Sequence, residues 1–169
     1  VPIGEKGEIC ARGYAVMHGY WNDQEKTRET IDAEGWLHSG DIGIMDTDGY
    51  TQVVGRIKDM IIRGGENIYP REVEEFLYTH PGIKEVAVFG IPDEKYGEQV
   101  CAWIQPQDGA VLTAEEVKGF CKGRISHFKI PYLIELVDSY PMTVTGKIQK
   151  FKMRDVMVER RRTVNCVAI

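Results

Sequence analysis

The 169-residue sequence has no excess of basic residues, no long apolar run and no closely spaced cysteine pair. Lys and Arg number 21 against 26 Asp and Glu, which gives a net charge of −5. This balance argues against nucleic acid as the main partner, because binding to a phosphate backbone needs a basic face. No apolar stretch approaches the roughly 18 residues of a membrane helix, and no signal peptide is evident, so we expect no transmembrane segment.

The spacing of cysteine and histidine indicates neither a metal cluster nor a disulfide framework. These residues are Cys10, Cys101, Cys121 and Cys166, together with His18, His38, His80 and His127. We interpret all four histidines as structural or surface residues. Without a disulfide framework a reducing compartment is favoured, and we predict a cytoplasmic location with the mitochondrial matrix as the alternative.

The sequence does contain enough apolar residues for a core. Hydrophobic residues make up 43% and charged residues 28%, which is ordinary for a globular protein. The chain opens at Val1, without an initiator methionine, and enters a glycine-rich, strand-like stretch at once, VPIGEKGEICARG. We therefore expect it to be cut from a longer protein.

The first part of the chain is predicted to be a partial, β-rich segment. Residues 7–13 and 50–57 have the composition of strands bounded by glycine. The polar stretch 22–31 between them is predicted to be a helix, capped by Asn22 or Asp23.

Beyond this segment, helices and strands alternate. The predicted elements are a hairpin that turns at Gly64-Gly65, a helix from Pro70 to Pro81-Gly82, strands at 85–91 and 99–104, a helix from the capping box Thr113–Glu116, a strand at 132–137, and a helix from about Ile148 to Glu159 with Phe151 and Val156 inward. This order predicts an α+β fold, with helices flanking a short, mostly antiparallel sheet. The charged residues 159–162 are interpreted as a solvated, frayed helix end.

The stretch 143-TVTGKIQK-150 places Lys147 at a turn that Gly146 permits. A Walker-type phosphate loop is excluded, because Pro141 stands where that motif needs glycine and Ile148 where it needs Ser or Thr. A surface lysine in a turn is the simplest interpretation. A compact cation on a flexible stem is nevertheless suited to meeting a shifting negative charge.

Two further stretches contain candidate ligand-binding residues. In 36-WLHSGDIG-43, Asp41 is expected in a turn, where its carboxylate would either accept hydrogen bonds from two ribose hydroxyls or stabilise the turn. In 55-GRIKDMIIRGGENIYPREVE-74, Arg56 and Lys58 mark a change in composition. The Gly64-Gly65 turn that follows would allow a ligand to approach the backbone closely; a hairpin with charged edges is the alternative.

Together and in this order, four stretches resemble the adenylate-forming superfamily, which includes acyl-CoA synthetases, the adenylation domains of peptide synthetases, and luciferases. They are GEICARGYAVMHGYW, WLHSGD, GRIKDMIIRGGENIYPREVE and TGKIQK. The likeness runs from about residue 4 to residue 155. The segments MIIRGGENIYP and KGRISHFKIP are similar to those of medium- or long-chain fatty-acyl-CoA synthetases.

The resemblance implies a two-domain organisation. Residues 1–57 would be the C-terminal tail of a large N-terminal domain that binds ATP and a carboxylic acid. Residues 58–169 would be a small, mobile C-terminal lid domain, with Lys58 at the hinge. Mg²⁺ would accompany ATP, with its ligands in the missing part of the large domain.

The resemblance also implies roles for individual residues. Asp41 and Arg56 match the ribose-binding pair, and Lys147 matches the catalytic lysine that bridges the substrate carboxylate and the α-phosphate of ATP during adenylation. In a second pose of the lid, Gly64 and Gly65 would line the tunnel for the pantetheine arm of CoA.

Five further positions are considered in the light of the same likeness. For the CoA phosphates the candidates are Lys122, Arg124 and Lys129, with Lys122 preferred and a solvated helix end as the alternative. Glu74 matches a motif glutamate that we interpret as structural. Ile62 stands where luciferase-like members carry a lysine, which weakens a light-emitting function.

The predicted function is therefore that of the C-terminal fragment of an AMP-forming fatty-acid–CoA ligase. Its expected partners are a fatty acid, ATP, CoA and the large domain of the same chain, and the fragment alone is expected to be inactive. The alternatives are an adenylation domain that loads a carrier protein and a non-catalytic binding module with the same fold.

Overall fold

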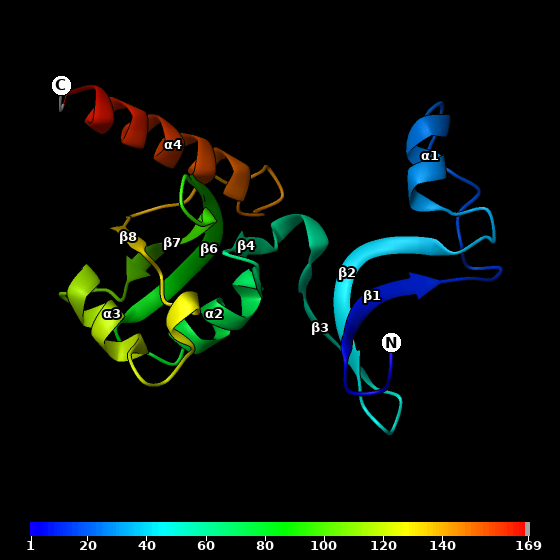
Figure 1. The fold of residues 1–169 in the computed structure, drawn as a ribbon, viewed down its shortest axis with the longest axis horizontal. Helices are drawn as coiled ribbons and strands as arrows, with labels where there is room; N and C mark the ends of the chain where they lie inside the picture. The colour runs from blue at the N-terminus through cyan, green and yellow to red at the C-terminus, as the bar shows by residue number, and fades with distance from the viewer. Residues whose placement is uncertain (168–169) are drawn as a thin grey trace. The chain divides into compact units, whose positions relative to one another are not determined.

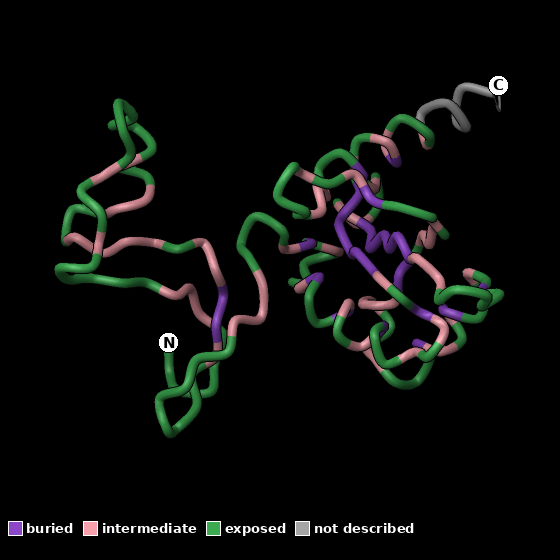
Figure 2. The backbone as a smooth tube through the Cα atoms, turned by 180° about the vertical axis from the view of Figure 1, so that it is seen from behind, coloured by how far each residue is buried: buried purple, intermediate pink, exposed green. Residues whose placement is uncertain are grey.

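The computed structural model describes residues 1–167, and the side chains as far as Arg161. The chain folds as two compact units, Val1–Lys58 and Asp59–Ile169, which we call the N-terminal unit and the C-terminal unit. Figure 1 shows the elements of each unit, and Figure 2 shows how far their residues are buried. No helix within residues 1–167 combines the length and the apolar character that crossing a membrane requires.

The N-terminal unit is a three-stranded antiparallel sheet with one short helix. Its strands are β1 (Lys6–Ala11), β2 (Leu37–Met45) and β3 (Thr51–Arg56), in that spatial order, and its helix is α1 (Gln24–Thr30). The Asp23 side chain caps α1 by accepting a hydrogen bond from the Lys26 N–H at 2.9 Å. Asn22 has a φ of +52° and is not the cap. A 3-10 turn, η1 (Ile57–Asp59), follows β3.

The C-terminal unit has the predicted order of elements. They are β4 (Ile61–Arg63), β5 (Glu66–Ile68), α2 (Pro70–Leu77), β6 (Ile83–Asp93), β7 (Gly97–Pro106), α3 (Ala114–Cys121), the 3-10 turn η2 (His127–Lys129), β8 (Leu133–Leu136) and α4 (Lys150–Val167). The sheet runs β5-β4-β7-β6, and β8 pairs with β7 in the parallel sense. The predicted α+β class is confirmed, and so is the Thr113–Glu116 capping box at α3.

Strand β7 carries apolar side chains on both faces, and each face has its own core. Val100, Ala102 and Ile104 pack with residues of α2 and α3. Cys101 and Trp103, which point the other way, pack with Met153 and Met157 of α4. Figure 1 shows α4 on one side of the sheet and α2 with α3 on the other. Successive strand residues face opposite ways, so a strand covered on both faces is apolar throughout.

Two predictions about α4 are wrong. Phe151 was expected to face inward but is 60% exposed, and Met153 and Met157 are the buried residues instead. Residues 159–162 were expected to be a frayed end, yet α4 continues to Val167. Arg160 NH1 lies 3.2 Å from Glu135 Oε2, and Arg161 NH1 donates to the Pro92 carbonyl at 2.8 Å. These contacts attach α4 to the sheet at Arg160 and Arg161; the Arg162 side chain lies outside the described residues.

Candidate functional site

Asp41 and Arg56 are brought together in the N-terminal unit. They are directly paired residues of β2 and β3, and Arg56 Nε donates to Asp41 Oδ1 at 2.8 Å. The Arg56 side chain is 69% exposed and that of Asp41 is 30% exposed. A carboxylate has several acceptor positions, so Asp41 keeps acceptor capacity for a ligand while the guanidinium holds it in place.

The expectation that Asp41 lies in a turn is wrong, because it lies within β2. The local sequence still departs from a regular strand. Between the pairs Glu8–Ile42 and Cys10–His38 the register shifts, so that three residues of β2 stand opposite one residue of β1. Gly40, with φ of +73°, lies in this bulge. Bulges redirect side chains, and Asp41 is the last of the three residues in this one.

Glu8 stabilises the bulge through hydrogen bonds. No pattern in the sequence predicts this role. Glu8 Oε1 accepts the Gly40 N–H at 3.0 Å, and Glu8 Oε2 lies 2.8 Å from His38 Nδ1. His38 Nε2 lies 3.4 Å from Asp32 Oδ2 on the other side of the ring. These contacts with Glu8 and then Asp32 raise the pKa of His38, because both carboxylates favour the charged imidazolium.

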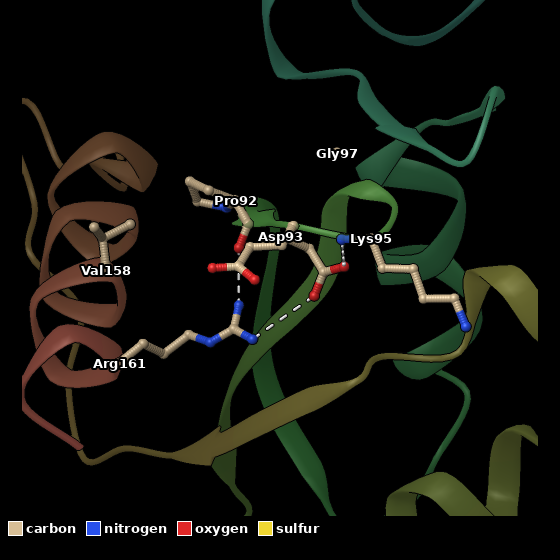
Figure 3. Close-up of a pocket in the computed structure, with 7 residues that line it drawn as sticks. Pro92, Asp93, Lys95, Gly97, Val158 and Arg161 are labelled. Carbon is tan, nitrogen blue, oxygen red and sulfur yellow. Dashed lines mark hydrogen bonds and ion pairs between the residues drawn. The ribbon is translucent and has the colours of Figure 1, made fainter. Parts of the chain in front are cut away.

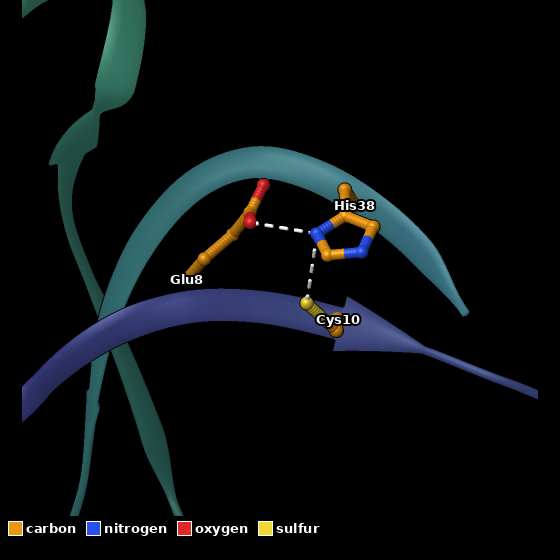
Figure 4. A group of neighbouring side chains, drawn as sticks. All are labelled: Glu8, Cys10 and His38. Carbon is orange, nitrogen blue, oxygen red and sulfur yellow. Dashed lines mark hydrogen bonds and ion pairs between the residues drawn. The ribbon is translucent and has the colours of Figure 1, made fainter. Parts of the chain in front are cut away.

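Glu8, Cys10 and His38 form the group drawn in Figure 4, with ligand-type atoms within 4.8 Å of one another. Cys10 Sγ lies 3.6 Å from His38 Nδ1. Both oxygens of Glu8 and both ring nitrogens of His38 have protein partners, and the 2.8 Å separation of Glu8 from His38 is that of a hydrogen bond. Hydrogen bonds therefore explain why these three side chains lie close together.

The described cysteines are poor nucleophiles. Cys10, Cys101 and Cys121 are free thiols, while the side chain of Cys166 lies outside the described residues. Burial raises the pKa of Cys101 to about 12 and that of Cys121 to about 11. Burial, followed by the charges of Glu8 and Asp32, also raises the pKa of Cys10. Since the thiolate is the reactive form, the described thiols are not catalytic candidates.

Lys147 is displayed on a tight turn of the C-terminal unit. Met142 and Ile148 form a β-bridge, and within it the Thr143 N–H donates to the Lys147 carbonyl at 2.8 Å. The Lys147 N–H in turn donates to Thr143 Oγ1 at 3.0 Å. Gly146 has φ of +79°, a conformation that glycine adopts without strain. The turn is fixed through its backbone, and the Lys147 side chain is exposed.

The Gly64-Gly65 turn joins β4 to β5 as predicted. Both residues have positive φ, +59° and +88°, as a two-residue hairpin turn of type I′ requires. Both are exposed, and a side-chain carbon at Gly65 would meet no atom within 4 Å. At Gly64 the Tyr96 ring would lie 3.3 Å from such a carbon, so the backbone of the turn is open to a ligand on the Gly65 side.

The basic residues near α3 differ in whether their charged groups already have a partner within the protein. Lys129 Nζ is paired with Glu72 Oε1, and the Arg124 guanidinium lies 4.6 Å from the centre of the Phe120 ring. Lys122 is the exposed C-cap residue of α3. Lys58 lies in η1, at the end of the N-terminal unit.

Glu74 is partly buried and bonds to structural partners. Its Oε1 accepts the Val88 N–H at 2.7 Å and lies 2.7 Å from Lys150 Nζ, with the Glu74 side chain 16% exposed. Glu74 thus ties α2 to β6 and to the start of α4.

A pocket of about 650 Å³ lies between the β6–β7 turn and α4 (Figure 3). Arg161 spans it, with NH2 3.7 Å from Asp93 Oδ2 and NH1 bonded to the Pro92 carbonyl. Arg161 is thus paired within the pocket, and none of the predicted site residues lines it.

The family model of the AMP-binding enzyme C-terminal domain matches residues 72–147, from α2 to the Lys147 turn. The mitochondrial medium-chain acyl-CoA ligase ACSF2 of Bos taurus is 57% identical over 155 residues. That alignment covers 92% of this chain and 25% of the relative. The chain thus spans about a quarter of the length of this curated relative.

Two solved structures share the fold over both units. ATP-bound MatB from Rhodopseudomonas palustris aligns with a TM-score of 0.87 and 36% identity, covering 92% of this chain and 31% of that chain. The o-succinylbenzoate CoA synthetase MenE from Bacillus subtilis, in complex with the acyl-adenylate intermediate OSB-AMP, aligns with a TM-score of 0.82 and 34% identity. The MenE alignment covers 91% of this chain and 31% of that chain.

Proposed function

Because this chain belongs to the adenylate-forming superfamily, as its motifs predicted, we propose that it is the C-terminal portion of an AMP-forming fatty-acid–CoA ligase. In the first step a carboxylate oxygen attacks the α-phosphorus of ATP, which gives an acyl-adenylate and releases pyrophosphate. In the second step the thiol of CoA attacks the acyl carbon and AMP leaves. The observation that carries this proposal is the 57% identity to an acyl-CoA ligase over 92% of the chain.

The proposal divides the chain between two domains of the complete protein. Residues 1–57 are the tail of a large N-terminal domain, and residues 58–169 are a mobile C-terminal domain with Lys58 at the hinge. The division of the chain after Lys58 and the much greater length of the relatives support this organisation.

In the adenylation step, we assign ribose binding to Asp41 and Arg56. The Asp41 carboxylate would accept the two ribose hydroxyls while its ion pair with Arg56 keeps it oriented. Lys147 would meet the charge that develops on the transferring phosphoryl oxygens. A pre-placed cation in a site closed to water is worth far more than one in bulk solvent, and the hydrogen-bonded turn at Lys147 would place its backbone.

In the thioester step, we assign the pantetheine arm of CoA to the Gly64-Gly65 turn and the CoA phosphates to Lys122. The turn presents backbone without side chains, which suits a narrow, extended ligand. Lys122 is preferred over Lys129, because the Lys129 ammonium is already paired with Glu72.

Mg²⁺ would accompany ATP and neutralise part of its charge. Magnesium prefers oxygen ligands in octahedral geometry, whereas the group Glu8, Cys10 and His38 offers one carboxylate, a thiol and an imidazole. Since this group does not fit Mg²⁺, we assign the magnesium ligands to the large domain.

For the location of the protein we propose the cytoplasm. The mitochondrial matrix is the alternative, because the bovine relative is named as a mitochondrial protein.

The test is an assay of the complete protein with ATP, Mg²⁺, CoA and fatty acids of graded length, with AMP and acyl-CoA measured by chromatography. We expect acid-dependent formation of both products, and none from residues 1–169 alone. In the complete protein, Asp41→Ala should raise the KM for ATP, whereas Asp48→Ala, at an exposed turn, should not. Absence of acid-dependent AMP formation by the complete protein would contradict the proposal.

A further inference from the structure

The hairpin that carries the Gly64-Gly65 turn is attached to the sheet largely through side chains and turn atoms. Backbone pairing between β4 and β7 consists of the single pair Arg63–Gly97. Three consecutive hairpin residues, Ile62, Arg63 and Gly64, make additional bonds to the start of β7 and the turn before it. Ile61 and Ile68, at the far end of the hairpin, are buried in the core. These bonds therefore act on the end of the hairpin that carries the glycine turn.

Each bond has good geometry. The Ile62 N–H donates to Glu98 Oε2 at 2.9 Å, and Arg63 Nε donates to Gln99 Oε1 at 2.7 Å. The Gly64 N–H donates to the carbonyl oxygen of Tyr96 at 2.8 Å.

Glu98 differs from the other anchors because its two carboxylate oxygens serve two different elements. Oε2 binds the hairpin, while Oε1 lies 2.9 Å from NH1 of Arg154 on α4. The Glu98 side chain is 20% exposed. A backbone N–H that donates to an ionised carboxylate makes a stronger bond than one that donates to a neutral acceptor. The ion pair with Arg154 fixes the direction in which this acceptor points.

Gly90 of β6 makes room for the Glu98 carboxylate. A methyl group at Gly90 would stand 3.0 Å from Glu98 Oε1 and 3.1 Å from Cδ, closer than ordinary van der Waals contact. Gly90 lies inside β6 and is not among the glycines with positive φ. Glycine is therefore needed at this position because the Glu98 carboxylate occupies the space that a side chain would fill.

We propose that Glu98 is a positioning residue for the thioester-forming step. Held by Arg154 and lying against Gly90, it bonds the Ile62 N–H and so fixes the Gly64-Gly65 turn in the place where the pantetheine arm is to pass. This inference rests on the proposed function of the turn. Glu98 itself contacts no reacting atom and acts only through the hairpin.

The test separates the two half-reactions in the complete protein. Adenylation is followed by acid-dependent exchange of pyrophosphate into ATP, and thioester formation is followed from supplied acyl-adenylate and CoA. Glu98→Ala should slow thioester formation about tenfold, equivalent to about 1.4 kcal/mol, and leave adenylation within about twofold. Glu98→Gln keeps an oxygen acceptor for the Ile62 N–H and should recover part of the lost rate.

A glycine pair supplies a matched control that removes no polar group. Gly90→Ala should crowd the Glu98 carboxylate and slow thioester formation selectively. Gly119→Ala, in α3 where an added carbon meets no atom within 4 Å, should change neither half-reaction. The Gly90→Ala and Glu98→Gln variants keep the test informative if Glu98→Ala fails to fold.

Hydrogen exchange of the Ile62 amide measures the attachment without any assay of activity. In Glu98→Ala this amide should exchange faster, while the Val100 amide in the core of β7 keeps its protection. Equal slowing of both half-reactions, unchanged thioester formation, or unchanged exchange at Ile62 would each overturn the inference. If the wild-type protein forms no thioester, the proposed function fails, and the exchange rate alone then decides whether Glu98 holds the hairpin.

Discussion

The two units differ sharply in how much apolar surface each one buries by itself. In the C-terminal unit both faces of β7 are covered, and Val88, Val100 and Ile104 are fully buried. In the N-terminal unit Ile42 is the buried hydrophobic residue among those described, while Trp21 is 91% exposed. A sheet with helices on both faces satisfies its own apolar side chains, whereas a bare three-stranded sheet does not.

This difference bears on function. Lys147, Lys122 and the Gly64-Gly65 turn all lie on the unit with a complete core, which suits a body that is proposed to move as a whole. Asp41 and Arg56 lie on the three-stranded sheet of the N-terminal unit. Hydrogen bonds of polar side chains position them there, and not packing against a core.

The largest expected effect comes from separating the units. Residues 59–169 alone should unfold cooperatively, because both of their cores are internal to them. Residues 1–58 alone should show no cooperative transition, since a chain of this size is marginal even with a full core. Circular dichroism during heating and the dispersion of amide signals measure both outcomes. A cooperative transition in residues 1–58 would contradict the conclusion that this unit lacks a sufficient core of its own.

A smaller effect is expected from a cavity in the C-terminal unit. Ile104→Ala removes a fully buried side chain and should lower the free energy of unfolding by about 2–5 kcal/mol. Val111→Ala, where the side chain is 92% exposed, should change it by about 0.5 kcal/mol or less. Urea denaturation of residues 59–169 provides the measurement. Equal effects of the two substitutions would contradict the assigned core.

The smallest effect is a pH dependence in the N-terminal unit. The Glu8 and Asp32 carboxylates raise the pKa of His38, so the stabilisation from the charged ring is complete below the usual histidine pKa of about 6.5. It is lost as the pH rises through the higher value of the folded state. An NMR titration of the His38 ring should give a raised pKa, and Glu8→Gln should lower it. A His38 pKa at or below the usual value would contradict the two-carboxylate arrangement.

Local signals predicted most of the C-terminal unit. The Gly64-Gly65 turn, the proline at the start of α2 and the Thr113–Glu116 capping box each specify structure within a few residues. The order of helices and strands followed from these signals and from side-chain periodicity.

What the sequence did not predict depends on partners distant in the chain. The parallel pairing of β8 with β7 is set by tertiary packing. Phe151 and Met153 are both apolar residues at the start of one helix, and only the face that β6 and β7 offer decides that Met153 is buried.

The hydrogen bonds from the Glu8 and Glu98 side chains to distant backbone N–H groups were not predicted, for the same reason. Glu8 and Gly40 are 32 residues apart, and Glu98 and Ile62 are 36 apart. The residues that flank a glutamate in a strand do not indicate that its carboxylate will bind a backbone N–H far away in the chain.

The most direct test of the central claim, that Lys147 serves adenylation, is the rate of each half-reaction in Lys147→Ala of the complete protein. We expect acyl-adenylate formation to fall by about 10² or more, as when a group that stabilises transition-state charge is removed, with thioester formation from supplied acyl-adenylate largely kept. Lys84→Ala, which removes a partly exposed lysine paired with Asp108, is the control and should leave both rates unchanged. An unchanged rate of acyl-adenylate formation in Lys147→Ala, or an equal loss in both half-reactions, would contradict the account.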